Sequence, residues 1–225
     1  MKKDEKSEKK QKNEIKSAGA SGDRVKRRRR HDDLIALVEG AVIAALAVAL
    51  ELIPLPFRMA YGGSVSLGAI PIIYYSYRRG AVRGLAAGLI FAGVQMLLGF
   101  YLPPANNVLS VILCILLDYV FAFAFLGAAS LFSAPFESGG AGKKRGVRLA
   151  GYAVGAVAVS AVRFLCSFLS GIVLWGSYAP DGMEVWYYSL VYNGGYMVPN
   201  TLISAAAVTL LCAAVDPVTL RPMKK

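Results

Sequence analysis

Histidine and cysteine are almost missing from this chain of 225 residues, which contains one histidine, His31, and three cysteines. Nucleophilic triads and zinc sites depend on these residue types, and the cysteines at positions 114, 166 and 212 lack metal-ligand spacing. No paired-carboxylate motif stands out either. The sequence therefore favours neither an enzyme nor a metal-dependent protein, and we expect no cofactor.

Charged residues are also scarce, at 17% of the chain, whereas hydrophobic residues make up 56% and the mean hydropathy is +0.51. About a quarter of the residues in an average soluble domain are charged. The apolar residues are concentrated further, because residues 1–33 contain very few of them. This composition excludes an ordinary soluble enzyme, a disordered protein and a secreted disulfide scaffold, and it predicts a membrane protein with several spans.

The first 33 residues form a polar tail, and residues 1–30 hold thirteen Lys or Arg against five Asp or Glu. Such a segment cannot bury a core, so the sequence predicts that it is disordered. Its basic run Lys26–Arg30 lies directly before the first apolar segment. We expect a run in this place to bind anionic membrane lipid and orient the chain, rather than to bind nucleic acid.

Six apolar segments follow the tail, and their length and lack of alternation indicate helices rather than barrel strands. The sequence places them at about 34–53, 65–77, 81–102, 108–132, 149–175 and 190–215. A helix needs roughly 17–25 residues to cross the hydrocarbon core, so the second segment is short unless it extends into its flanks or is shielded by protein. We therefore expect an all-α integral membrane protein, a bundle of six transmembrane helices within residues 34–217.

The positive charges support this count and predict an orientation. If the N-terminus is cytoplasmic, then the tail, the 78–83 turn, the 133–148 loop and the C-terminal end place 23 of the 25 Lys and Arg residues inside. Basic residues concentrate on the cytoplasmic side of membrane proteins. Both termini, including the short basic segment 218–225, are therefore predicted to be cytoplasmic.

Pairs of small residues recur at helical spacing, namely Ala41 with Ala45, Gly84 with Gly88 and Gly151 with Gly155. Such pairs let helices approach closely in lipid. We expect each pair to serve packing within the chain.

The ionisable residues Asp118 and Arg163 lie deep inside the predicted spans. A charged side chain is costly in lipid, so such residues face the interior of the bundle and mark functional sites or pair with each other. Aromatic residues follow Asp118, at Tyr119, Phe121 and Phe123. A carboxylate beside aromatic rings suits a cationic or amine-bearing ligand, and a structural Asp118–Arg163 pair is the alternative.

The densest group of aromatic and polar residues lies between positions 163 and 200. It contains Trp175 and Trp186, tyrosines at 178, 187, 188, 192 and 196, and also Gly171 and Asn193. Part of this group fits the aromatic belt at the outer membrane interface. Together with Asp118 it composes a pocket for a flat, positively charged heteroaromatic ring, because ring faces attract cations and Asp118 and Asn193 supply directional hydrogen bonds.

A set of short motifs occurs in a fixed order along residues 39–215. They are Glu39-Gly-Ala-Val-Ile-Ala-Ala45, Gly62-Gly-Ser-Val-Ser66, Arg78-Arg79-Gly80, Leu117-Asp118-Tyr119, Ser170-Gly171 through Trp175 to Ser177-Tyr178-Ala179-Pro180, Trp186-Tyr-Tyr-Ser189 and Tyr192-Asn193. In this order and spacing they resemble the thiamine-binding S component of energy-coupling factor (ECF) vitamin transporters. The resemblance implies a six-helix bundle in a bacterial cell membrane that binds thiamine with high affinity at its outer side.

The resemblance also implies partners and contact residues. A membrane coupling subunit and two cytoplasmic ATPase subunits would supply the energy for uptake, and Ala41 and Ala45 would contact the coupling subunit. The implied thiamine contacts are Asp118, Tyr119, Gly171, Trp175, Tyr188 and Asn193. Asp118 would neutralise the thiazolium cation or accept from the exocyclic amine, Trp175 would stack on a ring, and Asn193 would pair with the pyrimidine edge.

One position departs from the family pattern, which usually has a histidine four residues before Gly171, where this chain has Ser167. We include Ser167 in the predicted contact set, although serine is short and cannot stack. The pocket is then looser, is refilled by a neighbour such as Phe168, or is tuned to a thiamine precursor. Two alternatives remain: the same transporter class with a precursor or another vitamin as ligand, and an integral membrane enzyme or scaffold that recruits partners through its basic tail.

Overall fold

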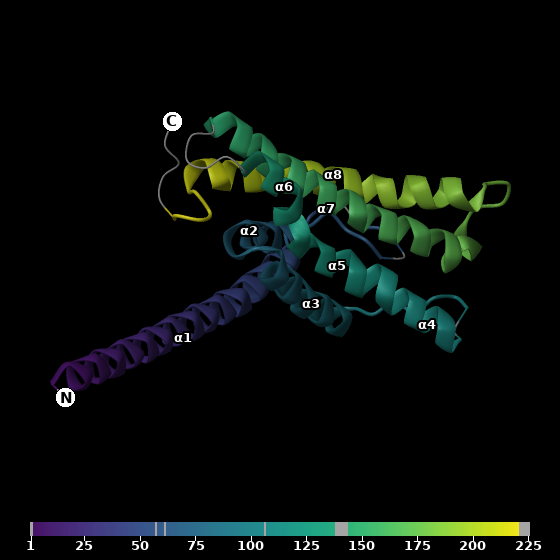
Figure 1. Cartoon of the computed structure of the whole chain (residues 1–225). Coiled ribbons are helices and arrows are strands. Elements are labelled where there is room, and N and C mark those ends of the chain that lie inside the picture. Colours follow the sequence, from purple (N-terminus) through teal and green to yellow (C-terminus); the bar gives the residue numbers. More distant parts are fainter. Residues whose placement is uncertain (1, 57, 61, 106, 138–143, 221–225) are drawn as a thin grey trace. The chain divides into compact units, whose positions relative to one another are not determined.

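The computed structural model describes residues 2–56, 58–60, 62–105, 107–137 and 144–220, with side chains from Lys26 onward. These residues fold mainly into helices (Figure 1), and Arg58 and Ser64 form an isolated antiparallel bridge in one loop. In chain order the helices are α1 (Lys2–Glu51), α2 (Ala69–Arg79), α3 (Ala81–Leu98), α4 (Val108–Cys114), the π-helix η1 (Ile115–Phe121), α5 (Ala122–Ala124), the 3-10 helix η2 (Phe125–Ala128), α6 (Ala129–Glu137), α7 (Arg145–Val173), the 3-10 helix η4 (Gly176–Tyr178) and α8 (Val185–Ala214).

Residues 1–39 and residues 40–225 form two separate compact units. In the first unit the structure describes helix from Lys2 onward, where the sequence analysis expects a disordered tail. Lys, Glu, Gln and Ala dominate residues 2–20 and have high helix propensity, which accounts for the difference. The basic run Lys26–Arg30 is exposed. The domain bounds at residues 33 and 217 stay a prediction.

Among the described residues, five helices are long and apolar enough to cross a membrane. They are Lys26–Glu51, Ala81–Leu98, Val108–Phe136, Arg145–Val173 and Val185–Ala214. The segment predicted at 65–77 folds instead as α2, whose 11 residues are too few to span. Most of its side chains are buried, with Ile72 and Ile73 fully so, which means that protein surrounds this short helix.

Apart from the start of α1, the long apolar segments fold as helices whose ends differ from the predicted ones by a few residues. The third segment ends at Leu98 instead of 102, because the chain turns to an extended conformation at Gly99. The fourth begins at Val108, where the Asn107 side chain accepts a hydrogen bond from the Ser110 N–H at 2.9 Å and caps the helix. It continues to Glu137 through irregular π and 3-10 turns.

Small residues allow close helix contacts within residues 40–225. A Cβ added at Gly84, Gly88 or Gly155 would lie closer than 3.0 Å to the backbone of the 122–129 stretch. These three glycines therefore serve packing within the chain, as predicted. Ala41 and Ala45, in contrast, are exposed on α1.

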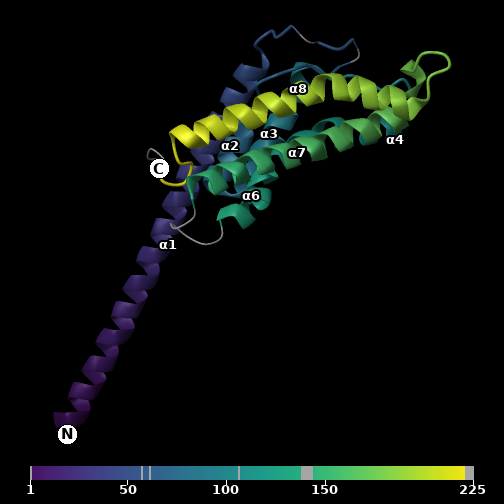
Figure 2. The ribbon, with the colours of Figure 1, turned by 90° about the horizontal axis from the view of Figure 1, so that it is seen from above.

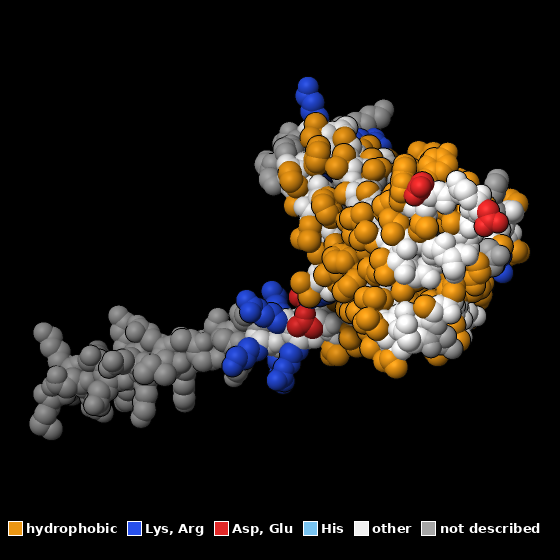
Figure 3. Space-filling view, turned by 90° about the vertical axis from the view of Figure 1, so that its right-hand side faces the viewer, with side chains coloured by type: hydrophobic (Ala, Val, Ile, Leu, Met, Phe, Trp, Pro, Cys, Tyr) orange, Lys and Arg blue, Asp and Glu red, His pale blue; other side chains and the backbone are white. Residues whose placement is uncertain are grey.

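Helices α7 and α8 lie side by side and run in opposite directions (Figure 2). Apolar side chains cover much of the visible surface of the helical unit (Figure 3), and the exposed ones include Leu97, Leu131, Leu165, Leu202 and Leu210. Leucines exposed at this density around long helices are typical of a surface that faces lipid tails.

A polar cluster ties the first turns of α7 to the segment after α8. Arg148 forms an ion pair with Asp216 at 2.6 Å, and the other Asp216 oxygen accepts from the N–H groups of Val218 at 2.9 Å and Thr219 at 3.0 Å. Burial alone would raise the pKa of the Asp216 carboxyl. The Thr219 N–H, the Arg148 guanidinium and the Val218 N–H outweigh that effect and hold this pKa below its usual value.

Candidate ligand-binding site

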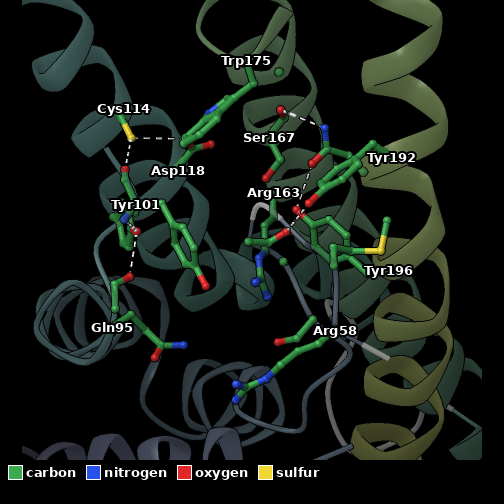
Figure 4. Close-up of a pocket in the computed structure, with 18 of the residues that line it drawn as sticks. Arg58, Gln95, Tyr101, Cys114, Asp118, Arg163, Ser167, Trp175, Tyr192 and Tyr196 are labelled. Atoms are coloured by element: carbon green, nitrogen blue, oxygen red, sulfur yellow. Dashed lines mark hydrogen bonds between the residues drawn. The ribbon is translucent and has the colours of Figure 1, made fainter. Parts of the chain in front are cut away.

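A cavity of about 340 Å³ lies between α7, α8, η1, the end of α3 and the loop after α1 (Figure 4). Small-molecule sites fall in the range of about 300–1,000 Å³. The structure brings all seven predicted ligand contacts to this one cavity: Asp118, Tyr119, Ser167, Gly171, Trp175, Tyr188 and Asn193. Their shared position is an observation, and their contact with a ligand stays a prediction.

Asp118 lies on the π-helical turn η1, and its carboxylate is held by three donors. Its Oδ2 accepts from Ser170 Oγ at 2.6 Å, from Trp175 Nε1 at 3.2 Å and from Cys114 Sγ at 3.5 Å. No hydrogen bond from the described residues reaches Oδ1. A carboxylate fixed on one oxygen in this way presents the other in a defined direction. Single π turns within α-helices occur frequently at functional sites.

Arg163 extends toward the same central space as Arg58 (Figure 4). Its guanidinium carbon lies 4.5 Å from the centre of the Phe123 ring, a cation–π contact. Across the described part of the chain Arg163 and Asp118 form no ion pair, so the alternative of a structural pair does not hold in this structure. Both charges remain directed to the cavity.

Asn193 links α7 to α8. Its Nδ2 donates to the backbone oxygens of Ser167 at 3.2 Å and Ser189 at 3.0 Å, and its Oδ1 accepts from Tyr196 Oη at 3.0 Å. Gly171 makes this approach possible, because a Cβ there would collide with Ser189 Oγ and lie 3.0 Å from Asn193 Nδ2. Because Gly171 has no side chain, α7 and α8 can lie close together at this part of the cavity wall.

Tyr119 uses its hydroxyl to fix the loop between α3 and α4. The hydroxyl donates to the Gly99 oxygen at 3.0 Å and accepts from the Tyr101 N–H at 3.1 Å. Its ring packs near Phe100, with centroids 5.4 Å apart. The side chain therefore contributes its ring to the cavity while its polar atom is occupied by the loop.

Two pairs of aromatic rings contribute to the wall of the cavity. The ring of Trp175 stacks near Tyr178 with centroids 5.9 Å apart, and the Tyr188 and Tyr192 centroids are 5.6 Å apart. All four residues line the cavity. Trp186 does not belong to the described lining and is 53% exposed, in keeping with an interface belt.

The space beside Ser167 is not filled by Phe168. The Phe168 ring stacks on Phe164 with centroids 6.0 Å apart and is not part of the described lining. Tyr196 and Asn193 form the wall next to Ser167 instead. This corrects one of the three expectations for the serine position.

Four hydrogen bonds hold the loop after α1 in place. Tyr192 Oη donates to the Gly62 oxygen at 3.0 Å, and the Met59 N–H bonds to the Gly63 oxygen at 2.9 Å within the loop. Asn200 Nδ2 donates to the Ser64 oxygen at 2.7 Å, and its Oδ1 accepts from the Ser66 N–H at 2.8 Å. Gly62 and Gly63 adopt φ values of 98° and 87°, which favour glycine and allow the tight turn.

The predicted contact set does not include Cys114, Ser170, Tyr196 and Asn200, which support the site, although Ser170 lies in one of the quoted motifs and Tyr196 in the aromatic group. For α8 a signal existed, because the buried polar residues Ser189, Asn193, Tyr196, Asn200 and Ser204 recur every three or four positions. That spacing places them on one helix face. For Ser170 the motif gave the position but not the partner, since it bonds to a carboxylate 52 positions earlier in the chain.

Apolar helices of spanning length around a cavity lined by both polar and aromatic side chains are typical of a multi-pass membrane protein with a candidate ligand site between its helices. The family profile described as Thiamine transporter protein (Thia_YuaJ) matches residues 37–219, so the chain belongs to this family. Transporter membership excludes the enzyme alternative, and the relatives fit a multi-pass protein of a bacterial membrane.

Named relatives agree with the family match. Thiamine transporter ThiT of Bacillus subtilis (strain 168) is 36% identical over 181 residues, covering 79% of this chain and 90% of the relative. Thiamine transporter ThiT of Lacticaseibacillus paracasei is 32% identical over 187 residues, covering 80% and 88%. A solved structure of ThiT from Listeria monocytogenes matches with a TM-score of 0.66 at 27% identity, covering 80% of this chain and 94% of that one.

Proposed function

We propose that this chain is the thiamine-binding membrane subunit of an ECF-type transporter and that it captures thiamine with high affinity in the cavity. The observation that carries the proposal is the meeting of all seven predicted contacts in one cavity, with Asp118 held by Ser170 and Trp175. Family membership and the thiamine-transporter names of the relatives support the choice of ligand.

The chemistry of the cavity suits thiamine. The vitamin has a permanent thiazolium cation and an aminopyrimidine ring, both flat. Trp175, Tyr188 and Tyr192 offer ring faces that attract a cation. Asp118 Oδ1 is placed to accept from the exocyclic amine or to neutralise the thiazolium. Asn193 Oδ1 keeps a second lone pair for a donor of the ligand, because the described residues supply one hydrogen bond to it.

The proposed topology has six membrane helices, with the short α2 completing the count inside the protein, and cytoplasmic termini. Support comes from the two ends of α7. The helix starts at the basic residues Arg145 and Arg148, whereas Arg163, Ser167 and Gly171 line the cavity toward its other end. Because basic residues favour the cytoplasmic side, the cavity would lie toward the outside.

Energy for uptake would come from a membrane coupling subunit and two cytoplasmic ATPases. Ala41 and Ala45 lie exposed on α1, where small side chains permit close approach of a partner helix in lipid. This exposure supports α1 as the docking helix for the coupling subunit. Membrane lipid would contact the rest of the apolar surface.

Ser167 favours one alternative ligand. Ser167 lacks the imidazole ring of the histidine that the family pattern has at this position. A thiamine precursor with a single ring is therefore the second candidate. Competition between thiamine and its hydroxymethylpyrimidine and thiazole fragments separates the two. If a fragment competes as well as thiamine does, the precursor is the ligand; if fragments bind far more weakly, thiamine is.

Tryptophan fluorescence tests the proposed function. In a Trp186→Phe variant, only Trp175 reports, and we expect thiamine to quench its emission saturably in detergent-purified protein without ATP. Asp118→Asn should weaken binding by about 100-fold, since a charge-assisted contact is lost. Asp181→Asn, at an exposed turn, is the matched control. A folded protein that stays silent at micromolar thiamine, or equal effects of both Asp variants, would overturn the proposal.

A further inference from the structure

Glu51 is the last residue of α1 and a charged lining residue of the cavity that no family motif includes. Its Oε2 is fully buried and has no hydrogen-bond partner among the described residues. Buried polar atoms in proteins nearly always have a partner, and an unsatisfied carboxylate oxygen is costly. The position of Glu51 in the wall of a binding cavity therefore calls for an explanation.

The surroundings of Glu51 hold its carboxylate in a narrow space. A Cβ added at Gly68 would lie 2.5 Å from Glu51 Oε2 and 2.8 Å from the Phe91 ring. Gly68 thus leaves room for the carboxylate that any other residue would take. The described residues that pack there offer Oε2 no hydrogen-bond donor. Because Glu51 also lines the cavity, a positive charge bound there would stabilise its carboxylate.

The charged residues that line the cavity indicate what the negative charge of Glu51 does there. Four of its described lining residues are charged: Glu51, Arg58, Asp118 and Arg163. Together they sum to zero. Without Glu51 the sum is positive, and a positive cavity would repel a permanent cation. Glu51 forms no ion pair with Arg58 or Arg163 in the described structure, so its charge is available to a ligand.

We infer that Glu51 is a second acidic residue of the site, which offsets the two arginines and allows a permanently cationic ligand to bind. This inference rests on the proposed function, because thiamine supplies the cation. Asp118, held by three donors, then contributes direction, whereas Glu51 contributes charge. Both carboxylates act on the same ligand. Asp118 requires a group of the ligand at a defined position, whereas Glu51 requires the positive charge of the ligand.

A neutral analogue of the ligand separates charge from shape. Deazathiamine keeps the aminopyrimidine and the hydroxyethyl group of thiamine, but an uncharged ring replaces the thiazolium. We expect Glu51→Gln, which has the same shape, to weaken thiamine binding by about tenfold or more and to change deazathiamine binding by less than about threefold. Glu184→Gln, an exposed residue outside the described lining, is the matched control and should change neither.

Arg58 provides a test of opposite sign. Arg58→Gln removes a positive charge, so thiamine should bind more tightly, by a smaller factor because Arg58 is exposed and screened by solvent. Deazathiamine binding shows that each variant is folded. Equal weakening of both ligands by Glu51→Gln, or no weakening of either, would overturn the inference while the proposed function stands. A wild-type protein that binds neither ligand would overturn both.

Discussion

Ser170 gives Asp118 its shortest hydrogen bond, at 2.6 Å, and lies in the buried part of α7. Hydrogen bonds to charged groups contribute about 1.5–3 kcal/mol. We therefore expect Ser170→Ala to weaken thiamine binding by about 10-fold to 100-fold, measured by titration of Trp175 fluorescence. Ser177→Ala, at an exposed position in η4, should leave binding unchanged. Comparable losses in both variants would mean that the bond to Asp118 does not orient the carboxylate.

Gly171 is predicted to tolerate no side chain. A Cβ there would collide with Ser189 Oγ, so Gly171→Ala should push α7 and α8 apart and displace Asn193. Overpacking of this kind costs about 1–3 kcal/mol. We expect a lower midpoint of thermal unfolding in detergent together with weaker thiamine binding.

Gly194→Ala is the matched control for Gly171→Ala. No heavy atom lies within 4 Å of a Cβ added there, and Gly194 is in α8, the helix that Gly171 of α7 packs against. Alanine is a better helix former than glycine, so this variant should be neutral or slightly more stable. Unchanged stability and binding in both variants would contradict the role assigned to Gly171.

Asn200 of α8 holds the loop after α1 in place, because it forms hydrogen bonds with both Ser64 and Ser66. Asn200→Ala leaves the Ser66 N–H without its partner, at a cost of about 1–3 kcal/mol. We expect faster release of thiamine in stopped-flow fluorescence, because the loop lines the cavity. Thr201→Ala removes a bond within α8 only, to the Met197 oxygen, and should not change the release rate.

The polar face of α8 also shows how far periodicity reaches. Asn193 was recognised from its motif, and its spacing to Tyr196 and Asn200 places the three on one face. Periodicity alone cannot tell which helix or loop that face meets. The partners of Asn200 lie 134 and 136 positions away, so only the folded chain identifies them.

The cluster of Arg148 and Asp216 is expected to make the stability of the whole molecule depend on pH. The folded-state pKa of Asp216 lies below the ordinary value of about 3.9. Its contribution to stability is therefore fully present above that value and is lost as the pH falls through the lower folded pKa. Asp216→Asn should lower the unfolding temperature at pH 7, and the difference from wild type should shrink below about pH 4.

Asp181→Asn serves as the control for Asp216→Asn, since Asp181 is exposed in the turn before α8. It should leave the unfolding temperature unchanged at both pH values. A difference between wild type and Asp216→Asn that is constant from pH 7 to pH 3 would show that the charge of Asp216 does not act through Arg148.

The tail separates the transporter from the scaffold alternative. Under the transporter proposal, removal of residues 1–30 should reduce expression or correct insertion, because the basic run Lys26–Arg30 is lost. Thiamine binding by the purified truncated protein should stay within about twofold of wild type, since the cavity residues are in a separate compact unit. Abolished binding in a folded truncated protein would favour a function centred on the tail.

The order of residues along the chain was enough to identify the class of protein, the long apolar helices, the family and seven residues that meet in one cavity. Composition, run length and short motifs are local properties, and each can be recognised without knowing what a segment touches. The short α2 was flagged for the same reason, because its length is also local. The extent of helix before residue 34 was not predicted from the sequence. The high charge of the tail favours disorder, whereas its helix propensity favours a helix.

Only the tertiary structure decided how the charged groups of the site are arranged. Asp118 pairs with Ser170 and Trp175 and not with Arg163, and Glu51 lies in the cavity wall although no motif contains it. Such contacts depend on helix rotation and on distances across the bundle. They join residues about 50 or more positions apart in the chain, beyond the reach of spacing along one helix.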